Sequence, residues 1–340
     1  MRTQLLKADE ISLQLAAKLL KEGQVVGIPT ETVYGLGADA LNESAVRAIF
    51  AAKERPADNP LIVHVAEFQD LEPLCHINDM ARKLNDAFWP GPLTMILPKK
   101  DIVPTVVTAN LDSVAIRMPA HPVAQQIIRL SGCPIAAPSA NRSGRPSPTQ
   151  AQHVYEDMDG RIPLIIDGGE SDVGVESTVV SLTGDTAVVL RPGGITPEMI
   201  AAVLGTCEVA DSVMRPLREG EEAPSPGMKH KHYAPKAPMT LYAGEKEKVA
   251  AYICQEYDLL PAGDALILAA HDHLPLYGDR KLFDLGPDAA SAAHALFAAL
   301  RHADHLGVRR VFSEAYPEEG VGLALMNRMA RAAGFDIVHL

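Results

Sequence analysis

The chain has 340 residues, of which 47% are hydrophobic and 22% are charged, so it is long enough for two domains of ordinary size with packed cores. Its formal net charge of −12 argues against a broad nucleic-acid-binding surface, although one local basic pocket remains compatible with it. Four scattered cysteines favour reduced thiols over a zinc site or disulfide framework, and the lack of a membrane-length apolar run or a signal-peptide core predicts a cytoplasmic protein.

Hydrophobic periodicity and proline breaks predict alternating strands and helices over the first two-thirds of the chain. The apolar residues of 8–21 recur at helical spacing and Gly23 follows as a stop signal. The predicted strands cover 24–28, 61–65, 93–97, 113–118, 134–137, 163–167, 177–182 and 187–191. Helices are predicted at 8–21, 44–53 and 79–88, and after His121, Pro148 and Pro197. This mixture indicates an α/β domain with a mixed, twisted sheet over 1–206, rather than a doubly wound parallel fold.

The pattern changes between residues 207 and 238, which contain five prolines and no hydrophobic period and are typical of an extended linker. Apolar strands and helices alternate again after it. The strands are predicted at 239–242, 265–269 and 310–312, and the helices at 246–255, 289–306 and 323–333. We therefore expect a second α/β domain over 239–340. It contains no G-x-G-x-x-G or Walker A sequence, so nothing there indicates a dinucleotide or P-loop site.

Four short polar segments stand out because each places hydroxyl, guanidinium or amide groups beside proline and glycine. They are PTETVYGLG at 29–37, KERPADNPLIVH at 53–64, PSANRSG at 138–144 and GVESTVV at 174–180. Rigid polar segments of this kind make poor core and poor linker. They suit the walls of a site for a small, highly polar ligand.

The second of these segments contains Lys53, Arg55 and His64. A cation near the end of a helix also complements the helix dipole, so the two cations alone leave function and structure equally open. Strand alternation puts Ile62 and His64 on one face, where a satisfied core histidine is the usual alternative to a ligand contact. The nearness of all three to Asn59 favours a binding site.

Arg117 lies in an otherwise apolar strand, VAIRMP, where a buried guanidinium needs a partner. A buried ion pair with an acidic residue satisfies that need. So does a ligand carboxylate, because two parallel N–H groups of arginine match two oxygens. The sequence leaves both interpretations open.

The remaining candidates lie in turns or beside them. The PSANRSG segment has the hydroxyls and the glycine of an anion-binding loop, although the same pattern is ordinary turn chemistry. Ser177 and Thr178 lie in GVESTVV, where threonine is common in strands, and Arg191 opens the rigid turn RPGG. The absence of G-x-S-x-G, H-E-x-x-H and C-x-x-C sequences disfavours covalent catalysis and a tightly held zinc ion.

These residues together suggest two ligands, a polyphosphate and a small zwitterion. The cations for the polyphosphate are Lys53, Arg55 and Arg191, and the groups for the zwitterion are Arg117, His64, Thr32 and Ser177. With no nucleophile or general-base triad in view, the chemistry would run by positioning and charge stabilisation, as phosphoryl and nucleotidyl transfers largely do.

The joint order of P-T-E-T-x-Y-G-L-G, K-x-R-P-x-x-N-P-L-x-x-H, P-S-A-N-x-S-G and S-T-V-V followed by L-R-P-G resembles the threonylcarbamoyl-AMP synthase family. SPGMKHKHYAP and the C-terminal extension resemble its long, two-domain form, so that the resemblance covers essentially the whole chain. It implies a YrdC-like α/β fold, with a twisted mixed sheet and flanking helices, plus a smaller Rossmann-like α/β domain.

The resemblance also implies an activity. The family converts L-threonine, bicarbonate or CO2, and ATP into L-threonylcarbamoyl-AMP and pyrophosphate, the first step of the t6A modification at adenosine 37 of tRNA. It implies a nucleotidyltransferase that uses Mg²⁺ bound with ATP, rather than a tightly held metal. The product would pass to the tRNA-modifying transferase machinery, with weak or absent direct tRNA binding and no membrane association.

Carried over position by position, the resemblance implies specific contacts. Threonine would be held by Thr32, His64, Arg117 and Ser177. ATP would be held by Arg55, Asn59, Ser139, Ser147, Arg191 and Tyr233, with main-chain contacts near Ser113 and Ala137. Lys53 and Arg55 would be the catalytic cations at the phosphates. Tyr233 would bring the linker over the site as a lid, and His230 departs from the aromatic residue more often expected there.

Two other functions fit parts of the sequence. A carbamoyltransferase of hydrogenase maturation contains a similar module, but it normally carries an acylphosphatase-like region and cysteine-rich zinc fingers, which four scattered cysteines do not provide. A double-stranded RNA-binding module would use a concave basic face, against which the net charge of −12 argues.

Overall fold

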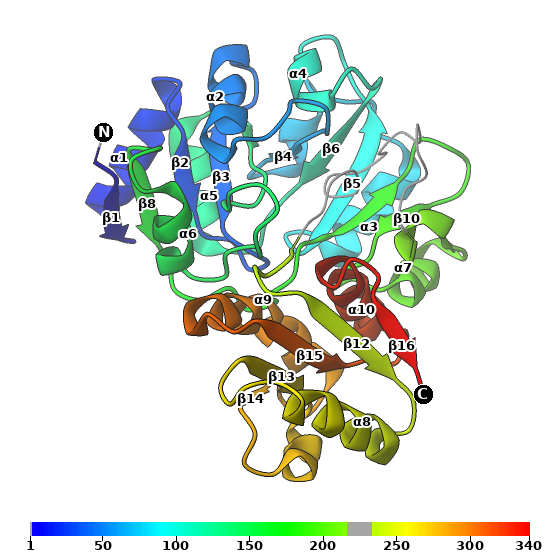
Figure 1. Ribbon diagram of the computed structural model, residues 1–340. Helices are drawn as coiled ribbons and strands as arrows, with labels where there is room; N and C mark the ends of the chain where they lie inside the picture. The colour runs from blue at the N-terminus through cyan, green and yellow to red at the C-terminus, as the bar shows by residue number, and fades with distance from the viewer. Residues whose placement is uncertain (1, 216–232) are drawn as a thin grey trace.

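The computed structural model of the protein describes residues 2–215 and 233–340. Two β-sheets define its two domains, and Figure 1 shows the first domain above the second, with helices packed beside both sheets. The larger sheet has eleven strands, in the order β1-β8-β2-β3-β7-β4-β6-β5-β9-β10-β11, and the smaller one has five, in the order β14-β13-β15-β12-β16. The predicted mixed α/β architecture with a second α/β domain is therefore confirmed.

The elements of the first domain follow one another from residue 4 to residue 213. Its strands are β1 (Gln4–Lys7), β2 (Val26–Ile28), β3 (Gly35–Asp39), β4 (Ile62–His64), β5 (Leu93–Pro98), β6 (Ser113–Arg117), β7 (Ile135–Ala136), β8 (Leu164–Asp167), β9 (Thr178–Ser181), β10 (Val188–Arg191) and β11 (Glu208–Val209). Its helices are α1 (Glu10–Lys21), α2 (Glu43–Lys53), α3 (Asp79–Phe88), α4 (Thr105–Thr108), α5 (Pro122–Ser131), α6 (Ala151–Met158) and α7 (Pro197–Leu204), with short 3-10 helices η1 (Phe68–Leu71) and η2 (Asp211–Val213).

The second domain is a parallel sheet with helical connections. Its strands are β12 (Met239–Ala243), β13 (Ala265–Ala269), β14 (Leu282–Asp284), β15 (Arg310–Glu314) and β16 (Ile337–His339). Its helices are α8 (Lys246–Asp258), α9 (Ala289–Leu306) and α10 (Val321–Ala332), with the 3-10 helix η3 (His271–Tyr277). All of its strand pairs are parallel, which accords with a βα-alternating sequence.

Of two strands next to the site, β3 was not predicted and β7 was predicted too long. The strand β3 has the sequence GLGAD, whose two glycines and lack of β-branched residues hide it from propensity rules. It forms because β2 and β7 pair with it on either side in antiparallel register. The strand predicted at 134–137 contracts to the two residues of β7. The short strands β1, β11, β14 and β16 also escaped prediction.

The segment predicted as linker and lid, 207–238, is described only in part. Its first residues continue the first sheet, because β11 pairs in parallel with β10. Its last residues lead into β12, and Lys236 N donates to Asp304 Oδ1 in α9. Residues 216–232, including Gly227 and His230, lie outside the described residues.

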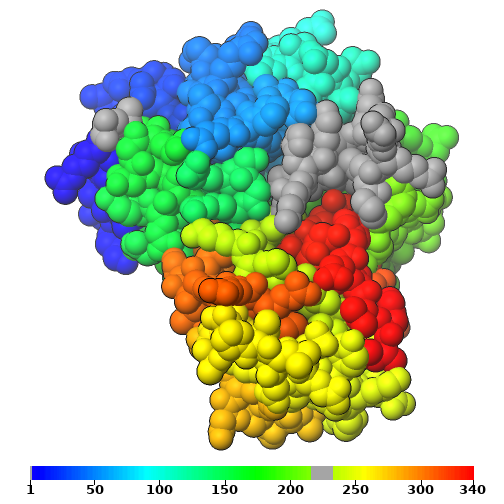
Figure 2. Space-filling model, viewed as in Figure 1, coloured from blue at the N-terminus to red at the C-terminus, as the bar shows by residue number. Residues whose placement is uncertain are grey.

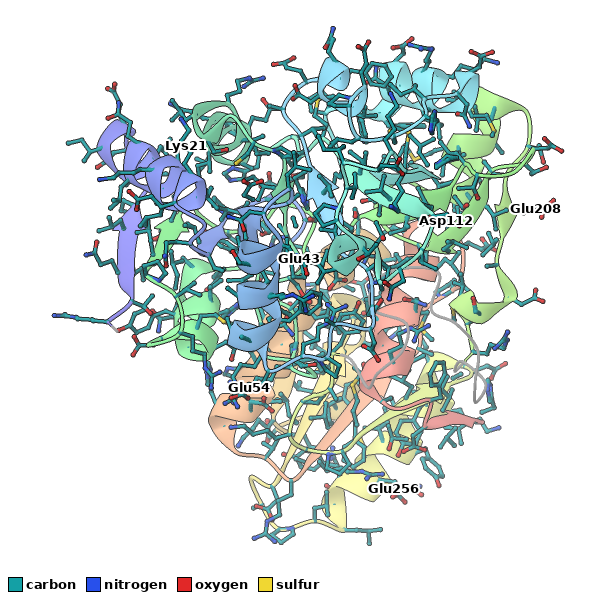
Figure 3. The ribbon with its side chains drawn as sticks, turned by 90° about the horizontal axis from the view of Figure 1, so that it is seen from above. Lys21, Glu43, Glu54, Asp112, Glu208 and Glu256 are labelled. Carbon is teal, nitrogen blue, oxygen red and sulfur yellow. The ribbon has the colours of Figure 1, made fainter. Side chains whose placement is uncertain are left out.

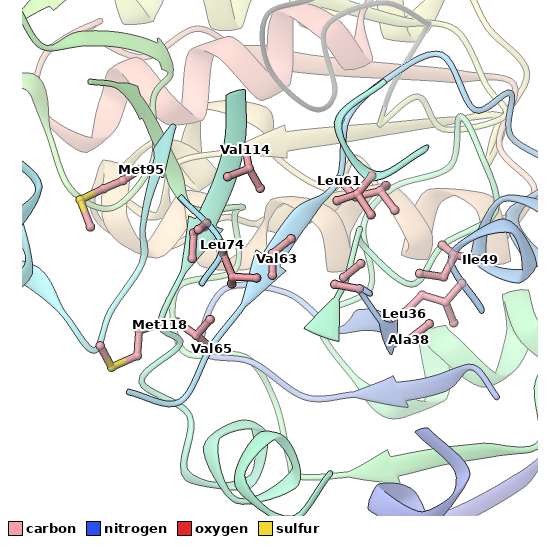
Figure 4. Packing of buried hydrophobic residues seen from close by; sticks show 14 of the residues in the cluster. Leu36, Ala38, Ile49, Leu61, Val63, Val65, Leu74, Met95, Val114 and Met118 are labelled. Carbon is pink, nitrogen blue, oxygen red and sulfur yellow. The ribbon is translucent and has the colours of Figure 1, made fainter. Parts of the chain in front are cut away.

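The main core of the first domain packs α2, α3, α4, α6 and α7 against its sheet, whereas α1 and α5 pack in a separate cluster. Figure 4 shows Leu36 and Ala38 of β3 near Ile49 of α2, with Val63 of β4 in the same layer. Val114 of β6 also belongs to this cluster. The core thus packs against the strands from which the polar segments extend, and this packing fixes the position of those segments.

The two domains are in direct contact, as the adjoining upper and lower lobes of Figure 2 show. Val33 and Val175, from two of the polar segments, belong to the same hydrophobic cluster as Phe297 of the second domain. Gly174 fits there only because it has no side chain: a Cβ would lie 2.3 Å from the Cα of His294 in α9. The second domain therefore packs directly behind segments predicted to form a ligand site.

Surface charge is spread over the molecule. Figure 3 labels Glu43 on α2, Asp112 before β6 and Glu208 on β11, which are all exposed and belong to separate elements. None of the helices within residues 2–215 and 233–340 is both long and apolar enough to cross a membrane.

Candidate active site

A pocket lies where the ends of several strands of the first domain meet the interface with the second. It is lined by Thr30, Thr32, Val33, Gly35, Arg55, Pro60, Leu61, Ile62, His64, Arg117, Ala137, Pro138, Ser139, Glu176, Ser177, Arg191 and Tyr233. The empty space in it is about 610 Å³ when the part open to solvent is included. This volume lies in the range of small-molecule sites.

Arg117, at the end of β6, forms one side of the pocket. Its Nη1 donates to Thr32 Oγ1 at 2.8 Å, and its Nη2 lies 2.7 Å from Glu31 Oε1. Both side chains of the Glu31 pair are almost completely buried. Burial by itself raises the pKa of Glu31, but the charge of Arg117 and the N–H of Ala120 outweigh it and lower the pKa. The ion-pair interpretation left open by the sequence is thus realised, and the guanidinium also borders the pocket.

His64 lies beside Arg117, because the parallel strands β4 and β6 pair these residues in register. Ile62 and His64 both line the pocket, as strand alternation predicts. The ring Nδ1 is 3.2 Å from the carbonyl oxygen of Ile62. Burial, followed by the charge of Arg117, lowers the pKa of His64 to about 3. The imidazole is therefore neutral at physiological pH and is a weak base.

The lowered pKa of His64 makes a prediction about stability. The unfolded chain, where the pKa of this side chain is near 6.5, binds a proton more readily than the folded protein does. Protonation therefore does not lower the free energy of unfolding above pH 6.5, and lowers it progressively as pH falls from 6.5 towards 3. We expect His64→Gln to flatten this decline by up to about 1.4 kcal/mol per pH unit. Urea unfolding at pH 7, 6 and 5 measures it. The exposed His76→Gln serves as the control, and an equal slope in both variants would contradict the prediction.

The PSANRSG loop is held from behind by Lys53, the last residue of α2. The Lys53 Nζ donates to the carbonyl oxygens of Ser139 and Asn141, the latter at 2.6 Å. Burial, followed by the charge of Arg55, lowers the pKa of Lys53. Within the loop, Ser139 Oγ donates to Asn141 Oδ1 at 2.6 Å, and Asn141 Nδ2 donates to Arg145 O at 2.9 Å. The ammonium group thus supports the loop and is not part of the pocket lining.

Arg55 lies two residues beyond the end of α2 and does line the pocket. The chain leaves the helix there because Glu54 adopts the left-handed conformation that ends α2. Arg55 Nη2 donates to the carbonyl oxygen of Asn59 at 3.1 Å, and its guanidinium lies 5.7 Å from the centre of the Phe50 ring. Burial lowers the pKa of Arg55 to about 10, so it still carries its charge at neutral pH.

A second wall of the pocket is built from Ser177, which precedes β9, and Arg191, the last residue of β10. Arg191 donates from Nε to the carbonyl oxygen of Ser177 at 3.0 Å and from Nη2 to its Oγ at 3.1 Å. Ser177 Oγ is also 2.8 Å from Thr94 Oγ1. Burial lowers the pKa of Arg191 to about 10. Tyr233 completes this wall and is 4% exposed, with its ring 5.2 Å from that of Phe297 in the second domain.

Most of the predicted site residues converge on this pocket. Those that line it are Thr32, Arg55, His64, Arg117, Ala137, Ser139, Ser177, Arg191 and Tyr233. Those that do not line it are Lys53, Asn59, Ser113 and Ser147. Asn59 contributes a carbonyl to Arg55, and Ser147 Oγ donates to Glu176 Oε1 at 2.5 Å. Ser113 begins β6, at the end opposite Arg117, and pairs with Pro98.

Two carboxylates of the site were missed by reasoning from the sequence. Glu31 pairs with Arg117, and Glu176 lines the pocket and accepts hydrogen bonds from Ser147 and Arg328. Both stand inside polar segments singled out for their other residues, so the signal was present in PTETVYGLG and GVESTVV. Arg328 belongs to α10 and carries no local signal at all.

The described residues contain no group of three or more histidine, cysteine, aspartate or glutamate side chains arranged to hold a metal ion. Glu176, the acidic residue in the pocket lining, is already engaged by Ser147 and Arg328. Divalent ions prefer several oxygen ligands. The side chains described at the pocket therefore do not fit a resident metal of the protein.

Comparison with known proteins defines the class to which this fold and pocket belong. Residues 18–193 match the Sua5/YciO/YrdC family, described as telomere recombination, and residues 195–334 match the family described as threonylcarbamoyl-AMP synthase, C-terminal domain. The chain is 46% identical over 335 residues to the threonylcarbamoyl-AMP synthase of Pyrococcus abyssi, covering 98% of this chain and 97% of that protein. It is 47% identical over 340 residues to that of Bacillus subtilis, covering 98% and 96%. The chain belongs to the threonylcarbamoyl-AMP synthase family, in its two-domain form.

A solved structure supports the same relationship in three dimensions. The structure of P. abyssi Sua5 complexed with L-threonine superposes with a TM-score of 0.91 at 44% sequence identity. It covers 99% of this chain and 100% of that chain. The similarity thus extends over both domains.

Proposed function

We propose that the protein is a nucleotidyltransferase that converts L-threonine, bicarbonate or CO2, and ATP into L-threonylcarbamoyl-AMP and pyrophosphate, the first step of the t6A modification of tRNA. The observation that carries the proposal is the convergence of Arg117, His64, Arg55 and Arg191 on one pocket of a family member. The full-length relatives bear the name of this activity, and a close structural neighbour was solved with threonine.

We assign the threonine carboxylate to the side of the pocket formed by Arg117. A guanidinium has five N–H groups, and Arg117 makes three contacts with Thr32, Glu31 and Gly91. Donors therefore remain for a ligand. The neutral His64 suits a binding contact better than proton abstraction, since a base with a pKa of about 3 is far from the useful range.

We assign the triphosphate to Arg55, Arg191 and the Ser139 loop. Both guanidinium groups keep their charge at neutral pH, and Ser139 borders the same cavity. In our proposal Lys53 is a positioning residue, since its ammonium group holds the loop carbonyls. Mg²⁺ would arrive on the phosphates of ATP, and no step of the mechanism depends on a protein ligand for it.

The proposed chemistry has two steps. The deprotonated threonine nitrogen attacks the carbon of CO2, which forms a carbamate and releases one proton. A carbamate oxygen then attacks the α-phosphorus in line, and the bond to the β,γ-diphosphate breaks to release pyrophosphate. Fixed cations near the phosphates stabilise the charge that develops on them. Water would hydrolyse both the carbamate and the mixed anhydride, so turnover requires that water be kept from them while they are bound.

The decisive experiment measures pyrophosphate release by the full chain. We expect release only when ATP, threonine and bicarbonate are all present, with an AMP-containing product of matching mass. Omitting each substrate in turn provides the controls. If threonine neither binds nor stimulates the release, the proposed function is wrong.

The same preparation tests the RNA-binding alternative. Filter binding to double-stranded RNA over a series of salt concentrations would have to give sub-micromolar affinity with a steep salt dependence to revive it.

A further inference from the structure

One residue of the second domain reaches the back of the pocket wall. Arg328 in α10 is fully buried. Its Nε donates to Glu176 Oε2 at 2.8 Å, its Nη1 donates to the carbonyl oxygen of Pro192 at 2.9 Å, and its Nη2 lies 3.3 Å from the carbonyl oxygen of Glu176. All three nitrogens of one planar group thus contact two segments of the first domain, and Nη1 also donates to Asn327 Oδ1 within α10 at 2.8 Å.

Those two segments carry the pocket residues on this wall. Glu176 precedes Ser177, and Pro192 follows Arg191. The segments lie so close that a Cβ on Gly193 would be 2.3 Å from the backbone nitrogen of Thr178. Arg328 therefore holds Glu176 and Pro192, which are the sequence neighbours of the pocket-lining residues Ser177 and Arg191.

Charge gives Arg328 a second effect on the site. Glu176 lines the pocket, and although burial raises its pKa, Arg328 and Arg191 outweigh this and lower it, so the carboxylate is ionised. A buried carboxylate without its cation would repel a polyphosphate, because the interaction is poorly screened away from water. The guanidinium also lies 5.9 Å from the ring centre of Tyr233, another part of the same wall.

We propose that Arg328 is a positioning residue through which the second domain sets the nucleotide site. It holds the Glu176–Ser177 and Arg191–Pro192 segments together. Its positive charge also offsets that of Glu176, so that the carboxylate does not repel the phosphates of ATP. The inference rests on the proposed function, since it names which of the two substrates the contact serves.

The test is the steady-state kinetics of pyrophosphate release by full-length variants. We expect Arg328→Met to raise the KM for ATP at least tenfold, and to raise it at least three times more than the KM for threonine, which carries no net charge. The double variant Glu176→Gln, Arg328→Met removes the carboxylate that lost its cation, and its KM for ATP should be at least threefold lower than that of Arg328→Met. A role limited to holding the domains together would give no such recovery.

A matched control lies on the other face of the second sheet. Ile267 in β13 is fully buried, in a cluster that contains no residue of the first domain. Ile267→Ala should lower the Tm and leave the KM for ATP within threefold of the wild-type value.

Equal ATP effects in Ile267→Ala and Arg328→Met, or no recovery in the double variant, would overturn the inference. If Arg328→Met does not fold, Arg328→Lys replaces it in the test, because lysine keeps the positive charge but lacks the planar guanidinium that contacts both segments. A threefold or greater rise in its KM for ATP is expected, and an unchanged KM refutes the proposal. If the wild-type protein itself lacks threonine-dependent pyrophosphate release, the proposed function fails instead.

Discussion

Replacing Arg55 by alanine should lower kcat for pyrophosphate release by about 10²–10³-fold, or about 2.7–4 kcal/mol of transition-state stabilisation. The reason is the fixed position of its charge: the guanidinium is buried at the pocket, is held by the carbonyl of Asn59 and stays protonated at neutral pH. A preorganised cation of this kind acts on charge that develops on the phosphates. Single-turnover measurements with saturating ATP separate this loss from weaker binding.

Arg142 provides the matched control for this variant. It belongs to the PSANRSG segment and pairs with Glu54, but its side chain is 41% exposed and does not line the pocket. Arg142→Ala should change kcat less than threefold. If Arg55→Ala and Arg142→Ala behave alike, or if the Arg55 loss appears only in the KM for threonine, then Arg55 does not stabilise the transferring phosphate.

Replacing Arg117 by methionine should lower the free energy of unfolding by about 3–5 kcal/mol, because it leaves Glu31 as a buried carboxylate without its cation. The same variant should bind threonine too weakly to detect by calorimetry if Arg117 holds the carboxylate, as we propose. Chemical denaturation measures the first effect. Glu31 stabilises the fold above its unfolded pKa and loses this contribution as pH falls, so the cost should shrink in acid.

An exposed ion pair supplies the control for Arg117→Met. Arg129 and Glu67 are 2.9 Å apart, and both side chains are about half exposed. Arg129→Met should cost no more than about 1 kcal/mol, since solvent screens such pairs. A similar cost in Arg117→Met would mean that Glu31 is not the buried charge that we describe. Adding Glu31→Gln to Arg117→Met should restore part of the lost stability.

Several elements were predictable because their signals are local. Helix α3 has the bounds predicted from its apolar spacing, and α9 runs to Leu306, where a glycine in the left-handed conformation follows it. The polar segments could be recognised for the same reason, since each concentrates unusual residue types within a few positions. Five of the residues proposed from these segments line one pocket: Thr32, Arg55, His64, Ser139 and Ser177.

Other features depend on residues that meet only when the chain has folded. Strand β3 has weak propensity and exists because its neighbours complete its hydrogen bonds. Lys53 was predicted to lie beside the phosphates from its place near Arg55, and only the fold shows that its Nζ also donates to the carbonyl oxygens of Ser139 and Asn141, 86 and 88 residues further along the chain. Residue type alone does not distinguish a cation that faces a ligand from one that supports the wall behind it.

The amino-acid sequence by itself determined the α/β character of both domains, the family, and nine of the residues that line the pocket. Only the tertiary structure decided how the charges are paired: Arg117 with Glu31, and Arg328 with Glu176 across 152 positions. Periodicity and short motifs report on neighbours along the chain, whereas the partner of a buried charge is set by which surfaces the packing of two domains brings together.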